Sequence, residues 1–293
     1  MKIGTHNGKF HSDDLFSVAM LLDMYPHAEV VRSRDMAVLD TCDIVLDVGG
    51  IYDTAKNRFD HHQQGRAGAR PNGVPYSALG LIWQVYGEKY CGNAEVARRL
   101  FDGFISSFDA YDNGIDTYKV IVEDARIVQL QDIFDKYMNP HIGEPSELED
   151  YDRVFMETIP LAQTILRRVV SRKKAEVDSE VYYFDQWQKS PNRRYVILDT
   201  FATSGDKAKE MAELLYSVYE GIDKKWYVKA MAKDKGGFEL KKPLPQNWAG
   251  LTDKELADVT GVIDAAFCHN ALFLCAAYSK DGAVKLMHLA LEN

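Results

Sequence analysis

Short apolar runs alternate with longer segments of helical periodicity through about the first 115 residues. Residues 44–48 are almost entirely apolar, and such a run without alternation is typical of a parallel strand covered on both faces. Between residues 15 and 22, apolar side chains recur instead at the spacing of one helix face. Strands are therefore predicted at residues 2–5, 29–33 and 43–48, and helices at 13–22, 77–86 and 94–111. This alternation predicts an α/β fold with a doubly wound parallel sheet.

A cluster of Pro, Gly, Asn and Ser at residues 139–146 is the clearest break in the pattern. Beyond it, a second and smaller α/β unit is predicted, with helices at 151–176, 207–219 and 282–291 and strands at 181–184, 195–198, 226–231 and 271–276. The length of 293 residues is sufficient for two domains. We therefore predict one domain over residues 1–145 and another over residues 146–293.

Histidine and aspartate residues gather where the apolar runs of the first domain end. They form four clusters, which contain His6, His11 and Asp13; Asp47; Asp60, His61 and His62; and Asp109 and Asp112. Ligand groups of open α/β sheets collect beyond the carboxyl ends of the strands, so these clusters are expected to converge. Imidazole and carboxylate ligands without thiolates suit Mn²⁺, Mg²⁺ or Zn²⁺. A hydrolase with two metal ions needs about six or seven such ligands, and the chain supplies them.

Three of these clusters also have an ordinary structural explanation. His61 and His62 are compatible with a surface loop, Asp47 with a helix cap, and Asp13 with the positive end of a helix dipole. The recurrence of these residue types in four clusters favours metal binding or catalysis instead. Asp60 is expected to orient an imidazole rather than to bind metal itself.

The composition indicates whether the protein is expected to bind nucleic acid or a membrane. The formal net charge of −9 argues against a protein coated in positive charge for nucleic-acid binding. A nucleic-acid substrate would need a local basic groove, for which the first domain offers Lys9, Arg32, Arg34, Arg58, Arg66 and Arg70. No apolar run approaches the ~20 residues that cross a bilayer. The start of the chain leads directly into a strand, so a cytoplasmic protein without membrane contact is expected.

The order of the motifs resembles the DHH phosphoesterase superfamily. The matching segments are residues 6–13, Asp47 with the following Val-Gly-Gly, Asp60-His61-His62, and Asp112-Asn-Gly. More narrowly, the chain is identified as a member of the melanocyte-proliferating-gene-one branch (MYG1-like, UPF0160), on residues 4–13, 31–35, 58–63, 244–251 and 267–273. The resemblance spans nearly the whole chain, and several independent motifs in the same order make it specific.

The resemblance implies two divalent ions, Mn²⁺ as the first choice and Mg²⁺ as the alternative, in a DHH-type catalytic domain. The sequence does not decide between Asp109 and Asp112, nor which of His6 and His11 fills which ligand position. Asp14 receives no role. The implied ligands are His6, His11, Asp13, Asp47, His61 and one or both of Asp109 and Asp112.

The resemblance also implies roles for residues that do not bind metal. His62 would contact the phosphoryl oxygens or protonate the leaving group. Arg58 and Arg34 would hold non-bridging oxygens in a bidentate grip. The second domain would close over the cleft and bind substrate, with His269 and Asn270 in contact with phosphate or sugar. These two residues are also compatible with a plain strand-edge pair.

Within the resembled branch, the implied activity is 3′→5′ exonuclease action on RNA, and the negative net charge favours a short oligonucleotide. One alternative is a hydrolase of a small phosphoanhydride or dinucleotide. A second is a metal-stabilised binding protein without turnover, against which the intact His/Asp set argues. The oligomeric state, a homodimer included, is left open by the sequence.

Overall fold

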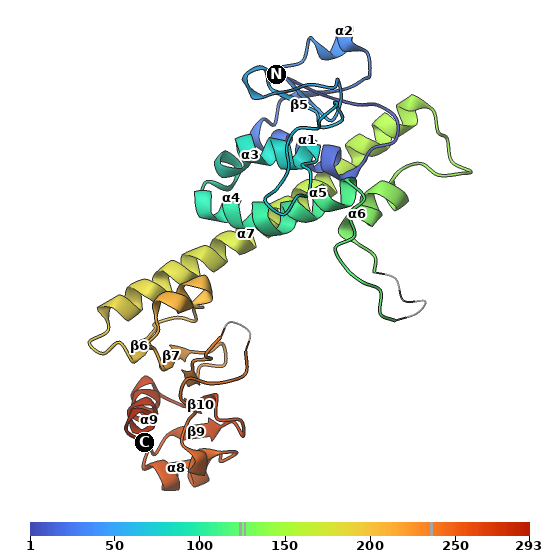
Figure 1. Ribbon diagram of the computed structural model, residues 1–293. Coiled ribbons are helices and arrows are strands. Elements are labelled where there is room, and N and C mark those ends of the chain that lie inside the picture. The colour runs from blue at the N-terminus through green and yellow to red at the C-terminus, as the bar shows by residue number, and fades with distance from the viewer. Residues whose placement is uncertain (123–124, 126, 235–236) are drawn as a thin grey trace. The chain divides into compact units, whose positions relative to one another are not determined.

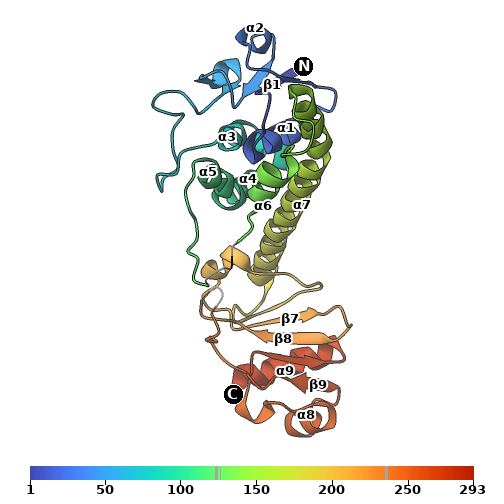
Figure 2. The ribbon, with the colours of Figure 1, turned by 90° about the vertical axis from the view of Figure 1, so that its right-hand side faces the viewer.

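The computed structural model describes residues 1–122, 125, 127–234 and 237–293. The chain divides into two compact units, residues 1–174 and residues 175–293. The long helix α7 (Leu148–Lys189) contributes residues to both units. Both units combine helices with a sheet, as Figures 1 and 2 show, so the predicted α/β fold class is confirmed.

Five strands form the sheet among the described residues of the first unit, in the order β2-β1-β3-β5-β4. Their bounds are β1 Lys2–Thr5, β2 Glu29–Arg32, β3 Ile44–Leu46, β4 Tyr52–Asp53 and β5 Arg58–Phe59. Four of them run parallel, and β4 pairs with β5 in the antiparallel direction. The carboxyl ends of β1, β2, β3 and β5 therefore meet at one edge of the sheet.

The first unit packs both faces of its sheet. Most of its helices lie on one side, and the short helix α2 (Met36–Leu39) lies on the other (Figures 1 and 2). On the α2 side, Leu39 and Cys42 pack against Val45, and a Cβ on Gly4 would lie 3.0 Å from Leu39. Burial on both faces explains why residues 44–46 are apolar without alternation. The remaining helices of this unit are α1 Ser12–Met24, α2 Met36–Leu39, α3 Ala78–Cys91, α4 Ala94–Leu100, α5 Ser106–Asp112 and α6 Leu130–Asp132.

Two π-helical turns interrupt the helices that surround the carboxyl edge of the sheet. The predicted helix at 94–111 is observed as α4, the π-helical turn η2 (Phe101–Ile105) and α5 in succession. A second π-helical turn, η3 (Ile133–Met138), follows α6. Phe16 of α1 packs against Phe104, Phe108 and Phe134, with ring centroids 4.8–6.4 Å apart. This aromatic cluster fixes both π-helical turns against α1.

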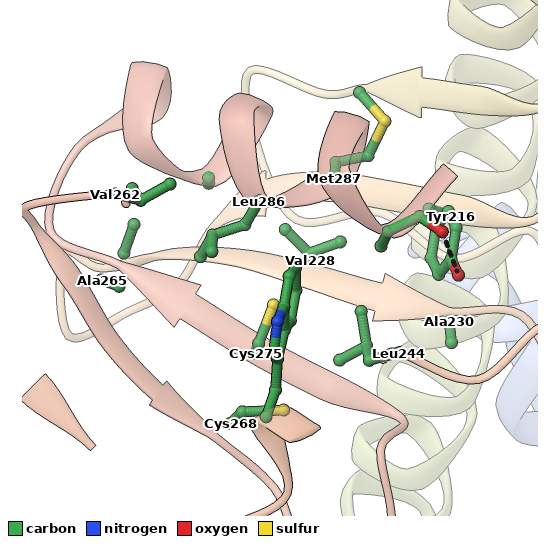
Figure 3. Packing of buried hydrophobic residues seen from close by; sticks show 14 of the residues in the cluster. Tyr216, Val228, Ala230, Leu244, Val262, Ala265, Cys268, Cys275, Leu286 and Met287 are labelled. Carbon is green, nitrogen blue, oxygen red and sulfur yellow. Dashed lines mark hydrogen bonds between the residues drawn. The ribbon is translucent and has the colours of Figure 1, made fainter. Parts of the chain in front are cut away.

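Within the described part of the second unit, five strands form a mixed sheet in the order β6-β7-β8-β10-β9. Figure 3 shows the core between this sheet and helix α9 (Lys280–Glu292), a cluster to which Leu286 and Met287 of the helix and Val228 and Cys275 of the sheet belong. The other elements are β6 Tyr195–Ile197, β7 Tyr216–Glu220, β8 Trp226–Ala230, β9 Ala265–Cys268, β10 Leu274–Ala277, α8 Asp253–Thr260, and the 3₁₀ turns η1 Thr54–Lys56 (first unit), η4 Gly205–Glu210 and η5 Gln246–Trp248.

Two predicted elements of the second unit are wrong. Residues 181–184, predicted as a strand, belong to α7, where Tyr183 is buried against Val196 and Leu198. Residues 207–219, predicted as a helix, form η4, a turn and then strand β7. The charged residues at 206–213 favour a helix locally, but Tyr216 and Val218 are fully buried and pair with β8, which places that segment in the sheet. Tertiary packing decided both segments.

Two further findings concern membrane-spanning helices and the state of the cysteines. Of the helices in the described ranges, none combines the length and the apolar character needed to cross a bilayer. The four cysteines, all within the described residues, are buried free thiols.

Candidate metal centre

The predicted clusters converge at the carboxyl edge of the sheet in the first unit. His6 directly follows β1, Asp47 directly follows β3, and residues 60–62 directly follow β5. His11 and Asp13 lie at the start of α1, which faces the same edge. The parallel strands therefore bring together side chains that are up to 56 residues apart in the sequence (6 to 62).

Asp47 lies at the middle of this group. Its Oδ2 is 3.3 Å from Nε2 of His6, and its Oδ1 is 3.1 Å from Nε2 of His61. Asp47 adopts the left-handed conformation, with φ of 56°, just before Gly49 and Gly50, which also have positive φ. This sharp turn directs a buried carboxylate between two imidazoles, an arrangement that suits a ligand shared by two neighbouring ions.

Three groups of ligand atoms each lie within 4.8 Å of one another: His6, His11 and Asp47; Asp47, His61 and His62; and His11, Asp13 and Asp112. Asp47 belongs to two of these groups and His11 to two. Adjacent groups therefore share residues, and they form one continuous site rather than three separate ones.

His6 and His11 each offer a ring nitrogen to this site. Nδ1 of His6 lies 3.2 Å from the carbonyl oxygen of Asn7, and since a carbonyl only accepts, Nδ1 carries the hydrogen. Nε2 of His6 is then the atom available to a metal. Burial lowers the pKa of His11, although the nearby charge of Asp47 opposes this effect. His11 is therefore neutral near pH 7, the form in which imidazole binds metals.

The site holds more buried carboxylates than its histidines neutralise. Burial raises the pKa of Asp14 to about 7 and that of Asp112 to about 6, and the charge of Asp47 adds to both shifts. Burial and the neighbouring aspartates also raise the pKa of Asp13 well above its usual value. Oδ1 of Asp13 is fully buried and accepts no hydrogen bond from any described residue. A divalent cation would compensate these charges, so the donor set fits a metal ion.

His62 stands at the margin of the site. Its Nδ1 lies 2.8 Å from Oδ1 of Asp60, and its side chain is 61% exposed. This hydrogen bond raises the pKa of His62. Asp60 is buried and also accepts from the amides of Gly50 and His62, so both of its oxygens are held in place. The pair leaves Nε2 of His62 directed away from Asp60.

The family to which the chain belongs follows from its whole sequence. The sequence model of MYG1_exonuc, described as an uncharacterised protein family (UPF0160), matches residues 2–291. The chain belongs to this MYG1 family. It is 28% identical over 318 residues to a MYG1 protein of Schizosaccharomyces pombe, covering 100% of this chain and 98% of the relative. It is also 28% identical over 333 residues to the MYG1 exonuclease of Homo sapiens, covering 100% of this chain and 86% of the relative. The branch expected from the sequence motifs is confirmed.

Asp109 and Asp112, which the sequence did not separate, occupy different places in this MYG1-family chain. Oδ2 of Asp112 lies 3.4 Å from Nε2 of His61, and Asp112 belongs to one of the groups of ligand atoms that could hold a metal ion. Asp109 belongs to none of these groups. Its buried carboxylate accepts hydrogen bonds from Nε of Arg70 at 2.5 Å and from the hydroxyl of Ser77 at 2.8 Å. A Cβ at Gly80 would collide with Asp109, so glycine leaves the room that this carboxylate needs.

This difference predicts opposite effects of two matched substitutions. Asp109→Asn leaves the buried Arg70 without its counter-charge and is expected to lower the free energy of unfolding by about 3–5 kcal/mol. Asp112→Asn removes like-charge repulsion, so the metal-free protein keeps or gains stability while its affinity for Mn²⁺ falls. Thermal unfolding with a chelator and Mn²⁺ titration measure the two effects. A stable Asp109→Asn variant that has lost Mn²⁺ binding would contradict this assignment.

The predicted phosphate-binding arginines are less closely tied to the site. Arg34 is exposed in the loop after β2, at the same edge of the sheet. Nη1 of Arg58 donates to the carbonyl oxygens of Lys56 and Asn57, at 3.0 and 3.4 Å. Arg58 is therefore held beside η1, and the structure brings neither guanidinium into a described contact with the histidines.

His269 and Asn270 belong to the second unit, in the turn between β9 and β10. Both are exposed. Nδ1 of His269 accepts from the amide of Ala271 at 3.0 Å, and its ring packs against Phe273 with a centroid distance of 4.4 Å. Asn270 lies against Gly250, whose φ of 75° and missing Cβ allow the contact. Their roles in substrate binding stay predictions.

Two aspartates of the site were not assigned from the sequence. Asp14 is buried, with Oδ2 3.3 Å from Nε2 of His6 and Oδ1 accepting from the amide of His11. Its signal was available, since a carboxylate three residues after a helix cap often bonds back to that cap. Asp135 is buried on η3, beside Ser12. No local pattern reveals that contact, because it joins residues 123 positions apart (12 to 135).

Proposed function

We propose that the chain is a metal-dependent phosphodiesterase, a 3′→5′ exonuclease that acts on RNA or short oligonucleotides. The observation that carries this proposal is the Asp47 carboxylate, buried between His6 and His61 and surrounded by carboxylates with raised pKa values. Such an excess of buried negative charge favours divalent ions. The names of the human and mouse relatives, MYG1 exonuclease, supply the reaction class.

Two Mn²⁺ or Mg²⁺ ions would be held by groups that share Asp47. One ion would be held by His6, His11 and Asp47, whose ligand atoms lie within 4.8 Å of one another. The other would be held by Asp47, His61 and Asp112, together with Asp13, whose ligand atom lies within 4.8 Å of that of Asp112. Bound there, the ions would supply Lewis acidity that polarises a phosphoryl oxygen and stabilises developing negative charge. Asp109, held by Arg70 and Ser77, is left out of this set.

His62 would deliver the proton that the leaving oxygen requires. Its exposed imidazole borders the ligand groups, with Nδ1 3.6 Å from Oδ1 of Asp47. Asp60 holds the hydrogen on Nδ1 and supports the positive charge of the protonated ring, so that Nε2–H faces the substrate. The pair thereby orients the ring before substrate binds.

The residues proposed to bind substrate have no described contact with the proposed metal ligands. Arg34 lies exposed at the carboxyl edge of the sheet, where its guanidinium can hold non-bridging phosphate oxygens. Arg58 would first have to release the carbonyls of Lys56 and Asn57. In the second unit, His269 and Asn270 would contact phosphate or sugar from their exposed turn. The net charge of −9 favours a short oligonucleotide over a long polymer.

The proposal is tested with matched short RNAs labelled at the 3′ or the 5′ end, incubated with the full chain and Mn²⁺. A 3′→5′ exonuclease releases the 3′ label at once as a mononucleotide and converts the 5′-labelled RNA into a descending ladder. The double variant with His61→Ala and His62→Ala is expected to leave both RNAs intact.

The same assay separates the alternatives. Cleavage of dinucleotides or pyrophosphate with intact RNA would replace the exonuclease by a small-molecule phosphohydrolase. Protection of RNA by a metal-loaded chain that releases no product from any of these substrates would indicate a binding protein. Release of the 5′ label first would reverse the proposed polarity.

A further inference from the structure

The loop that carries two of the histidines has no regular secondary structure. Residues 6–11 lie between β1 and α1 and connect His6 to His11, two residues before Asp13. A loop of this kind loses conformational entropy when its ligands are held for a metal ion. Contacts that order the loop in advance would therefore strengthen metal binding.

Asn139 holds this loop at Phe10, the residue before His11. The amide of Phe10 donates to Oδ1 of Asn139 at 3.0 Å, and Nδ2 of Asn139 donates to the carbonyl oxygen of Phe10 at 2.8 Å. The side-chain amide thus pairs with both backbone groups of one residue, as a neighbouring strand would. The pair is buried and joins positions 129 residues apart.

Asn139 is itself fixed on its own side. Nδ2 also faces the carbonyl oxygens of Phe134 and Asp135 in η3, at 3.2 and 3.3 Å. Its backbone is extended, with ψ of 147°, as expected for the residue before Pro140. Asn139 is 5% exposed. The donor and acceptor that meet Phe10 are therefore rigid.

Asp135, one helical turn before Asn139, holds the loop on the other side of His11. The carboxyl group of Asp135 is buried beside Ser12, whose polar groups oppose the rise that burial causes in the pKa of Asp135. Asn139 thus holds residue 10 by hydrogen bonds, and Asp135 lies beside residue 12; residues 10 and 12 flank His11 directly. On the other side of the loop, Nη2 of Arg32 donates to the carbonyl oxygen of Gly8 at 2.8 Å.

We propose that Asn139, together with Asp135, is a positioning residue that holds His11 and Asp13 in their metal-binding arrangement before any ion arrives. The inference rests on the proposed metal-dependent function, because it concerns the same ligands. In this proposal, residues 133–139 carry no metal ligand themselves but position the loop that does. Outer contacts of this kind typically change metal affinity by about 10–100-fold.

The test compares Mn²⁺ affinity and amide exchange in the full-length protein. Asn139→Ala is expected to raise the Kd for Mn²⁺ by about 10–100-fold. In the metal-free protein, the Phe10 amide is expected to exchange with solvent much faster than in the wild type, a readout that needs no activity. Asp135→Ala is expected to weaken Mn²⁺ binding as well. Asp135→Asn, which keeps the size of the side chain and an oxygen beside Ser12, is expected to retain most of the affinity.

Gln131→Ala provides the matched control. Gln131 is a buried polar residue on α6 that bonds to the hydroxyl of Ser107 and not to the loop. This variant is expected to lose stability without losing Mn²⁺ affinity. An Asn139→Ala protein that binds Mn²⁺ as tightly as the wild type, or a Gln131→Ala protein that loses as much affinity, would overturn the inference. A wild type that binds no divalent ion would overturn the proposed function as well.

Discussion

Asp47→Asn is expected to abolish stepwise release of nucleotides, with a fall in turnover of about 10³-fold or more (~4 kcal/mol). The substitution preserves the size of the side chain but removes the charge shared between His6 and His61, which lie 3.3 and 3.1 Å from its two oxygens. Both proposed ion sites lose one carboxylate ligand at once. Mn²⁺ titration of the same protein is expected to show weaker binding at every site that the wild type displays.

The control for this variant is Asp40→Asn, an exposed aspartate just after α2 in the same unit. It changes the net charge equally and is expected to leave turnover and Mn²⁺ binding unaltered. Measurements at saturating Mn²⁺ separate lost affinity from lost chemistry. If Asp47→Asn retained wild-type turnover, the shared-ligand proposal would be untenable.

His62→Ala is expected to lower turnover by about 10²–10⁴-fold while Mn²⁺ binding and thermal stability change little. The side chain is 61% exposed, so its loss leaves no cavity, and its proposed task is proton delivery rather than metal binding. Asp60→Asn is expected to lower turnover in the wild type but to have no further effect in the His62→Ala background. Two residues that act through one imidazole are not additive.

His27→Ala, at another exposed histidine of the first unit, is the matched control and is expected to retain activity. Asp60 also accepts a hydrogen bond from the amide of Gly50. If Asp60→Asn lowered turnover equally in the wild type and in the His62→Ala background, Asp60 would act through Gly50 rather than through the imidazole. Full activity of His62→Ala would remove His62 from the reaction.

The sequence predicted the first unit better than the second, for a physical reason. Residues 44–46 are apolar on both faces, and α1 repeats its apolar residues at helical spacing, so local pattern and tertiary packing agree there. In the second unit, the aromatic residues at 182–184 fit a strand by composition, yet they belong to a long helix and pack against the cluster that contains Val196 and Leu198. Residues 216–220 follow a charged segment with helical propensity, and pairing with β6 and β8 made them a strand.

The sequence by itself determined the α/β fold class, the MYG1 family and the kinds of ligand present, because these depend on local motifs and their order. Only the tertiary structure separated Asp109 from Asp112, since both lie on one helix and differ in whether Arg70 or His61 faces them. The tertiary structure also brought Asn139 to Phe10, across 129 positions. Such contacts depend on how helices pack over the sheet, which no local pattern encodes.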